Sequence, residues 1–214
     1  MDENAPLKDS GVEWIGEIPD HWELSRLGLM LKPYSVKNRP NETLLSITRE
    51  LGVIERDLED LESNHNFIPE DLSGYKLIEK GDFGMNKMKA WQGSYGVSKF
   101  TGIVSPAYYT FKLVDSISPD FFHFAIRSKI YVPFFGKASD GVRIGQWDLS
   151  KERMKRIPFV IPILDEQKEI LEYIDSISLK IETAINLKQQ EIEKLKEYKS
   201  SLINSVVTGK VKVC

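Results

Sequence analysis

Cysteine is almost absent from this chain of 214 residues, and its one cysteine, Cys214, is the last residue. A single thiol forms no internal disulfide and cannot build a thiolate metal site. Histidine is also scarce, with only His21, His65 and His123. These three are scattered and lack the spacing that places two imidazoles on one metal ion. The sequence therefore favours a reducing setting and predicts neither a bound metal nor a cofactor.

Long apolar runs are missing as well. No stretch approaches the roughly 20 consecutive apolar residues that a membrane-spanning helix needs. The first residues, MDENAPLKDSG, lack the basic, apolar and small-residue blocks of a signal peptide. We expect a cytoplasmic protein with no membrane partner.

The common catalytic motifs are absent too. The chain has no G-x-x-x-x-G-K-[ST] phosphate loop, no G-x-G-x-x-G sequence and no G-x-S-x-G nucleophile elbow. The sequence SPAY at 105–108 imitates the amine-binding box of amino-methyltransferases, but it lacks the second proline and is better explained as a turn before a strand. Asp120 with Glu166 and Lys168 imitates a nuclease core, but the E-x-K pattern opens a helix here. We therefore expect no catalytic residues.

Basic residues are slightly outnumbered, which leaves a net charge of −3. Binding to phosphates needs local lysine and arginine, so this balance does not by itself favour a nucleic-acid partner. The charges are nevertheless patterned, because basic residues gather in 26–39, 80–99 and 143–156 while acidic residues are dense in 55–62 and over the last fifty positions. DNA binding requires that one face collects the basic stretches.

Residues 1–162 have the pattern of a strand-rich, mixed α+β domain. Short apolar or alternating runs at 44–48, 75–79, 107–114 and 156–162 predict strands, and glycine and proline punctuate the chain between them.

Residues 119–130 predict one short helix in this domain. Its core face is expected to carry Phe121, Phe124, Ala125 and Ile126. His123 is expected to lie at the edge of the core and not to act as a base.

Residues 163–209 predict one long helix, followed by a short tail at 210–214. No glycine or proline interrupts this segment before Gly209, a natural C-terminal cap, and Asp165 is a suitable N-cap. The helix spans about 43 residues, or about 64 Å. A globular unit of about 160 residues cannot cover that length, so the distal half needs a partner helix.

The apolar residues of this helix recur mostly at steps of three, four or seven, which is typical of a coiled-coil seam. Lys188 and Lys199 interrupt the seam, which indicates register selection and a modest self-association. The predicted dimerisation residues are Ile174, Ile177, Ile181, Ile185, Ile192, Leu195, Leu202 and Val206.

Three stretches together resemble one known family. They are LKDSGVEWIGEIPDHWELSRLG (7–28), YKLIEKGDFGMNKMKAWQGSYGVSKFTGIVSPAYYTFKL (75–113) and DGVRIGQWDLSKERMKRIPFVIPILDEQKEILEYID (140–175). In combination they strongly resemble the specificity (S) subunit of Type I restriction–modification systems. No single stretch would be specific enough.

The resemblance implies a target-recognition domain at 1–162 and a spacer helix after it. It implies double-stranded DNA as a partner, together with methyltransferase (M) subunits and, through them, the restriction (R) subunit, which supply all the catalysis. Family members generally carry two recognition domains and two helices. This chain has one of each, so it resembles a half-subunit, natural or truncated.

The stretch 86–99 is the most promising DNA-contacting region, because it interleaves lysines with aromatic and amide side chains on a segment broken by glycines. The segment 143–147 and Arg49 are further candidates. Each could also be an ordinary solvated loop, and Trp91 and Trp147 could pack in the core. The candidate DNA-binding residues are Arg49, Lys87, Lys89, Trp91, Gln92, Ser94, Tyr95, Lys99, Arg143 and Gln146.

A homodimer paired antiparallel through 165–207 would hold two recognition domains apart, so that they read a bipartite site. Two other functions stay open. A coiled-coil scaffold would bind protein through the globular domain, and a fragment of an adenine methyltransferase would bind S-adenosylmethionine. A large effect of salt on binding would favour DNA, and tight binding of S-adenosylmethionine would favour the enzyme.

Overall fold

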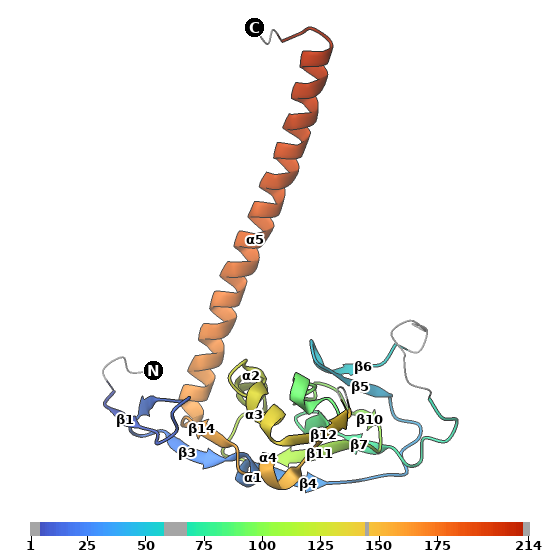
Figure 1. The fold of residues 1–214 in the computed structure, drawn as a ribbon, viewed down its shortest axis with the longest axis vertical. Helices are drawn as coiled ribbons and strands as arrows, with labels where there is room; N and C mark the ends of the chain where they lie inside the picture. Colours follow the sequence, from blue (N-terminus) through green and yellow to red (C-terminus); the bar gives the residue numbers. More distant parts are fainter. Residues whose placement is uncertain (1–4, 58–67, 144–145, 212–214) are drawn as a thin grey trace. The chain divides into compact units, whose positions relative to one another are not determined.

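The computed structural model describes residues 5–57, 68–143 and 146–211, and the side chains at 142–146 lie outside this description. The chain divides into two compact units, residues 1–168 and 169–214. The first holds all of the strands and the short helices, and the second consists of the long C-terminal helix beyond its first turn (Figure 1). This is the α+β architecture with one long helix that the sequence predicts.

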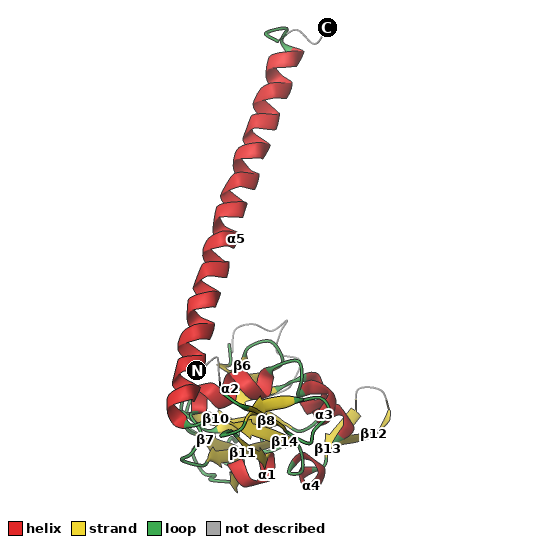
Figure 2. Cartoon of the chain, turned by 90° about the vertical axis from the view of Figure 1, so that its left-hand side faces the viewer, coloured by secondary structure: helices red, strands yellow, loops and turns green. Residues whose placement is uncertain are grey.

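A four-stranded antiparallel sheet forms the centre of the first unit (Figure 2). Its strands lie in the order β4 (Leu31–Tyr34), β11 (Tyr108–Leu113), β8 (Phe83–Asn86) and β9 (Tyr95–Val97). All four residues of β8 are buried, including Gly84. A Cβ atom at Gly84 would lie only 2.7 Å from the Ile78 side chain and 2.8 Å from Ile47, so this position excludes larger residues.

Five antiparallel strand pairs surround the sheet. They are β1 (Leu7–Asp9) with β2 (Glu17–Pro19), β3 (Glu23–Arg26) with β14 (Pro158–Ile161), β5 (Leu45–Thr48) with β6 (Gly52–Glu55), β7 (Lys76–Ile78) with β10 (Gly102–Val104), and β12 (Ser139–Arg143) with β13 (Gln146–Leu149). The short helices are α1 (Leu27–Met30), η1 (Ala90–Gln92), α2 (Pro119–Arg127), α3 (Val132–Lys137) and α4 (Lys151–Met154).

The four strand predictions at 44–48, 75–79, 107–114 and 156–162 are confirmed, with the ends shortened by one or two residues in β5, β7, β11 and β14. The antiparallel pairing of β3 with β14 joins the two ends of the globular part of the sequence. An early strand, the third in the chain, is therefore paired with the last strand of the domain.

A group of aromatic side chains lies in the core, among a larger number of aliphatic ones. The Phe83 ring lies 5.2 Å from that of Phe122 and 6.1 Å from those of Tyr95 and Phe111, measured between centroids. Phe122 lies 5.1 Å from Phe159 on β14. Helix α2 is therefore attached to both the central sheet and the β3–β14 strand pair.

The predicted core face of α2 is wrong in one position. Phe121 and Ile126 are buried as expected, but Phe124 is 46% exposed and Phe122 is fully buried in its place. Residues four apart share one helix face, so Phe122 and Ile126 point together into the core. Phe124, two residues from each, lies on another side.

Helix α5 spans Leu164–Val207, about 66 Å at the usual rise per residue. The predicted N-cap is wrong by two residues, because the helix already begins at Leu164 and Asp165 lies inside its first turn. The helix ends at Val207, two residues before the predicted cap residue Gly209, whose backbone is left-handed (φ 72°). The amide of Lys210 donates to the Ser205 carbonyl at 2.8 Å, so the turn at Gly209 supplies a donor for an exposed carbonyl of the last helical turn.

In the second unit, five of the predicted seam residues are largely exposed within this single chain, and Ile174, Ile177 and Val206 are half-buried. The five are Ile181 (54% exposed), Ile185 (60%), Ile192 (45%), Leu195 (59%) and Leu202 (42%). Across the described residues, no helix combines the length and the apolar character that a membrane crossing demands.

Candidate nucleic-acid interface

A polar hollow of about 320 Å³ lies on the first unit, beside the turn that joins β5 to β6. Its lining comes from four separate segments: β5 with its turn, the end of β8, the region around η1, and the start of β11. The residues that line it are Ser46, Ile47, Thr48, Arg49, Glu50, Asn86, Lys89, Gln92, Ser94 and Tyr108. We refer to this set as the polar hollow.

The floor of the polar hollow is held by backbone bonds between β8 and the loop after η1. The Asn86 amide donates to the Ser94 carbonyl at 2.9 Å, and both residues are buried. Gly93 ends η1 in a left-handed conformation (φ 93°), which turns the chain back toward β9. The loop is thereby folded over β8, so that Lys89, Gln92 and Ser94 line the same hollow.

Exposed charges lie at the β5–β6 turn and on the loop. Arg49 and Lys89 are exposed cations. The Arg49 Nε donates to the Glu50 carboxylate at 2.8 Å, and this hydrogen bond holds the pKa of Glu50 below its usual value. The hollow thus offers cationic donors, one carboxylate, and the amides and hydroxyls of its floor.

The turn itself is fixed by Arg127, the last residue of α2. Its guanidinium donates to the carbonyl oxygens of Arg49 at 2.9 Å and Glu50 at 2.7 Å, and also to that of Tyr95 on β9 at 2.6 Å. Arg127 therefore ties the turn to the central sheet. Burial is the main influence that lowers the pKa of Arg127, although a guanidinium stays charged at any physiological pH.

His123, one turn earlier on α2, lies at the edge of the core as predicted. Its Nδ1 accepts the backbone N–H of Val97 at 3.1 Å. Burial, followed by the charges of Arg127 and Lys99, lowers the pKa of His123 below its ordinary value of 6.5. The imidazole is therefore neutral at pH 7 and serves as a structural acceptor.

The structure brings four of the predicted DNA-contacting residues into the polar hollow: Arg49, Lys89, Gln92 and Ser94. These residues lie up to 45 positions apart in the sequence. The hydrogen bond from Arg127 to the Arg49 carbonyl and the pairing of β8 with β9 bring them together. Ser94 is only 2% exposed, so its side chain contributes to the floor and not to the rim.

Two predicted lysines lie elsewhere. Lys87 forms an ion pair with Asp148 on β13 at 3.0 Å. Lys99 is exposed and lines a different hollow, together with Lys80 and His123. Neither side chain lines the polar hollow.

Two predicted aromatic contacts are packed against other rings. Tyr95 is fully buried, 4.4 Å from the Phe135 ring, so it is a core residue and cannot reach DNA from this position. The half-buried Trp91 stacks on Trp147 with ring centroids 5.2 Å apart. The Trp91 Nε1 is buried without a hydrogen-bond partner among the described residues, which indicates packing and not recognition.

Arg143 and Gln146 belong to β12 and β13, but their side chains lie outside the described residues.

The sequence analysis missed several residues of the polar hollow, among them Ser46, Thr48, Glu50 and Asn86. A signal for the first two was present, because Ser46 and Thr48 alternate with the buried Leu45 and Ile47 along β5 and so share its opposite face. Asn86 begins the predicted stretch 86–99, but the sequence gives no reason to single it out, because its place in the hollow depends on the fold of the loop after η1.

The two imitations of catalytic motifs are explained structurally. The SPAY sequence forms a turn into β11, in which the Tyr108 amide donates to the Ser105 carbonyl at 3.0 Å. Glu166 lies in the first turn of α5 and accepts hydrogen bonds from Trp22 and His21. Over the ranges that the structure describes, no group of three or more histidine, cysteine, aspartate or glutamate residues could hold a metal ion.

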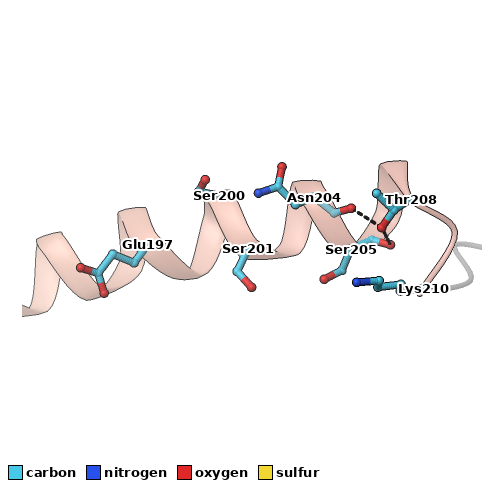
Figure 3. A pocket seen from close by; sticks show the side chains of 7 residues that line it. All are labelled: Glu197, Ser200, Ser201, Asn204, Ser205, Thr208 and Lys210. Carbon is cyan, nitrogen blue, oxygen red and sulfur yellow. Dashed lines mark hydrogen bonds between the residues drawn. The ribbon is translucent and has the colours of Figure 1, made fainter.

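A second hollow lies at the C-terminal end of α5, and Figure 3 shows its lining. Glu197, Ser201, Ser205 and Lys210 lie on one side of this helix end, whereas Ser200, Asn204 and Thr208 lie on the other. The Thr208 hydroxyl donates to the carbonyl of Asn204 at 2.7 Å, within its own helix. These side chains do not converge on a common point, so they do not build a binding site.

The chain belongs to the Type I restriction modification DNA specificity domain family, whose model matches residues 79–197. This match includes five of the ten residues that line the polar hollow and most of α5, whereas the β5–β6 turn with Arg49 and Glu50 lies before it. It confirms the family resemblance that the three sequence stretches indicate.

Two solved structures share the fold. The HsdS subunit from Thermoanaerobacter tengcongensis is 14% identical, with a TM-score of 0.61 over 91% of this chain and 50% of that one. A chain from a structure described as the "structural basis underlying complex assembly and conformational transition of the type I R-M system" is 13% identical, with a TM-score of 0.55 over 93% of this chain and 48% of that one. The present chain thus spans about half the length of the solved chains that it matches.

Proposed function

We propose that this chain is the DNA-sequence-recognition subunit of a Type I restriction–modification complex. It directs adenine methyltransferase subunits and ATP-dependent restriction subunits to their target and is itself not an enzyme. The observation that carries the proposal is the polar hollow, in which Arg49, Lys89 and Gln92 lie together. The chain that bears this hollow belongs to a DNA specificity family.

The donor and acceptor set of the polar hollow suits a DNA surface. Arginine and lysine bind phosphates and the guanine edge, and glutamine pairs with the adenine edge through two hydrogen bonds. Arg49 and Lys89 are exposed and Gln92 is half-buried, so these side chains are accessible from solvent. The binding surface is local, which reconciles DNA recognition with the net charge of −3.

Two copies of this chain are proposed to pair through α5 as an antiparallel coiled coil. The seam residues expose apolar surface along a helix of about 66 Å, more than an unpaired helix in water favours. The chain also spans half the length of the solved relatives, so two copies together supply the length of one such chain.

Antiparallel pairing would make the helix pair a ruler between two recognition domains. A two-fold dimer then reads a symmetric, bipartite site, and DNA half-sites recur at about 34–36 Å for each helical turn. Deleting one heptad from α5 would shorten it by about 10 Å, close to three base pairs at about 3.4 Å each. The preferred spacer should shorten accordingly, and an unchanged spacer in a site-selection assay would refute the ruler.

The effect of salt separates DNA recognition from a protein-binding scaffold. Each phosphate contact releases counterions when DNA binds. The affinity for duplex DNA should therefore fall steeply as the salt concentration rises from about 50 to about 200 mM. Binding measured by fluorescence anisotropy on labelled duplexes tests this directly. The complete chain should lose roughly tenfold or more in affinity, whereas a scaffold would show little binding at any salt concentration.

A further inference from the structure

Glu50 is an unexpected residue for a DNA-binding surface. Among the ten residues that line the polar hollow in the described part of the chain, it is the one carboxylate. A carboxylate repels DNA phosphates, so a hollow that contacts only the backbone gains nothing from it. The Glu50 side chain is 65% exposed, and an exposed ion pair such as that with Arg49 contributes little to stability. Neither phosphate binding nor folding therefore explains its presence.

The backbone that carries Glu50 is held rigidly. Arg127 donates to the carbonyls of both Arg49 and Glu50. On the other side of the turn, the Thr48 hydroxyl accepts the Leu51 amide and donates to the Gly52 carbonyl, each at 3.2 Å. A turn fixed at both ends presents its two charged side chains with little further loss of backbone entropy on binding.

The Arg49–Glu50 pair offers a donor–donor–acceptor pattern. The bond to Glu50 uses the Arg49 Nε, which leaves the two terminal guanidinium nitrogens for a bidentate contact. Across the major groove, a G·C pair offers the guanine N7 and O6 acceptors and then the cytosine N4 donor, whereas an A·T pair offers acceptor, donor, acceptor. The pattern of the ion pair is complementary to G·C alone.

We propose that Arg49 and Glu50 together read one G·C base pair in the major groove, with Arg49 donating to guanine O6 and N7 and Glu50 accepting from the cytosine N4 amino group. The inference rests on the proposed function and adds a specificity residue to it. Arg127 acts as a positioning residue, because it holds the turn through the two carbonyls and does not itself reach the base pair.

The variant Glu50→Ala tests the inference, because the substitution removes the acceptor, lies on the surface and should leave folding intact. The complete chain selects targets from random duplexes, and the affinity for the selected site is then compared with all four base pairs at each position. At one G·C position, the variant should lose about tenfold in discrimination, the order of one specific base contact. Its affinity for unrelated duplexes should not fall, since it carries one negative charge fewer.

Glu55→Ala is the matched control, because Glu55 is an exposed glutamate at the far end of the same strand pair, outside the polar hollow. It should keep the wild-type preference. The inference is overturned if Glu50→Ala keeps every base preference, or if the lost preference is for an A·T pair. Failure of the proposed function would look different, because the wild-type chain would then select no sequence at all.

Discussion

Trp22 donates its indole N–H to the Glu166 carboxylate at 2.7 Å, although 144 positions separate the two residues in the sequence. His21 contacts the same carboxylate oxygen through Nε2 at 2.9 Å. Glu166 is only 8% exposed, so these partners compensate for the burial of its charge. The sequence stretches at the two ends of the first unit, which the family resemblance singles out, therefore meet at the first turn of α5.

Gln167, the next residue, is the subject of a stability prediction. It is fully buried, accepts the Ser118 amide at 2.7 Å, and donates to the carbonyls of Ser116 at 3.1 Å and Pro162 at 2.8 Å. Gln167→Ala leaves these backbone groups without partners, so the free energy of unfolding should fall by about 3 kcal/mol. Urea denaturation followed by tryptophan fluorescence measures it.

The exposed Gln190 on the same helix supplies the control. Gln190→Ala should change the free energy of unfolding by less than about 0.5 kcal/mol. Equal effects of the two substitutions would mean that Gln167 does not anchor the first turn of α5.

His123 predicts a pH dependence of stability. Its pKa is lowered in the folded protein from the ordinary value of 6.5, so the unfolded chain binds more protons in the range just below that pH. Stability should therefore fall as the pH drops from 7 toward 5. In His123→Asn, whose amide oxygen can still accept the Val97 N–H, this part of the pH dependence should disappear.

Denaturant midpoints at several pH values measure the effect. The variant His21→Asn leaves His123 intact. Its stability should therefore still show the fall with decreasing pH that His123 causes. An identical pH slope in wild type and His123→Asn would contradict the assignment.

Much of this fold follows from local patterns. The alternation in 44–48 and 107–114 and the uninterrupted helical pattern after Asp165 predict the corresponding elements within one or two residues. The burial of Phe122 in place of Phe124 was not predictable, because the rotation of α2 depends on contacts with Phe83 and Phe159. Local periodicity indicates that a helix has a buried face, whereas the tertiary packing decides which face it is.

The polar hollow yields a prediction for DNA binding. Gln92→Ala should weaken binding to the selected target by about 1–3 kcal/mol, the value of a bidentate base contact, and leave binding to unrelated DNA unchanged. Lys89→Ala should weaken binding to all sequences and lower the salt slope by about one. Anisotropy titrations at several salt concentrations separate the two effects.

Lys87 and Lys196 are controls of two kinds. Lys196 is an exposed lysine of α5 paired with Glu193, and its substitution by alanine should leave DNA binding unaltered. Lys87→Ala tests the original prediction from the sequence, since its ion pair with Asp148 would have to open for a DNA contact. Full affinity in both Lys89→Ala and Gln92→Ala would move the interface away from the polar hollow.

The α5 seam yields a prediction for assembly. Ile185 and Leu187 are each 60% exposed in the single chain, but only Ile185 lies on the predicted seam. Ile185→Asp places a charge in the buried seam of the paired helices, so it should raise the dissociation constant of the homodimer at least about tenfold. Leu187→Asp lies outside the seam and should leave this constant unchanged. Light scattering should give about 49 kDa for wild type and Leu187→Asp, twice the 24.5 kDa of one chain, and a lower mass for Ile185→Asp.

A wild-type mass of 24.5 kDa at high concentration would contradict the homodimer. The exposed seam would then have to pair with a different chain.

The candidate site was only partly predictable. The mixture of lysines, glutamine and glycines at 86–99 pointed to a stretch that lines the polar hollow in part, and Arg49, which follows a strand, lines the same hollow. The sequence did not separate Tyr95, which fills the core, from Gln92, which lines the hollow, because both lie in the same loop-rich stretch. Long-range contacts, such as Arg127 on the Arg49 turn, make that distinction.

The most direct test of the central claim is selection of targets by the complete chain, with its methyltransferase subunits present, from a pool of random DNA duplexes. The account predicts enrichment of a symmetric site in two parts, divided by a spacer of fixed length. Recovery of unenriched sequences, with binding that does not respond to salt, would contradict it.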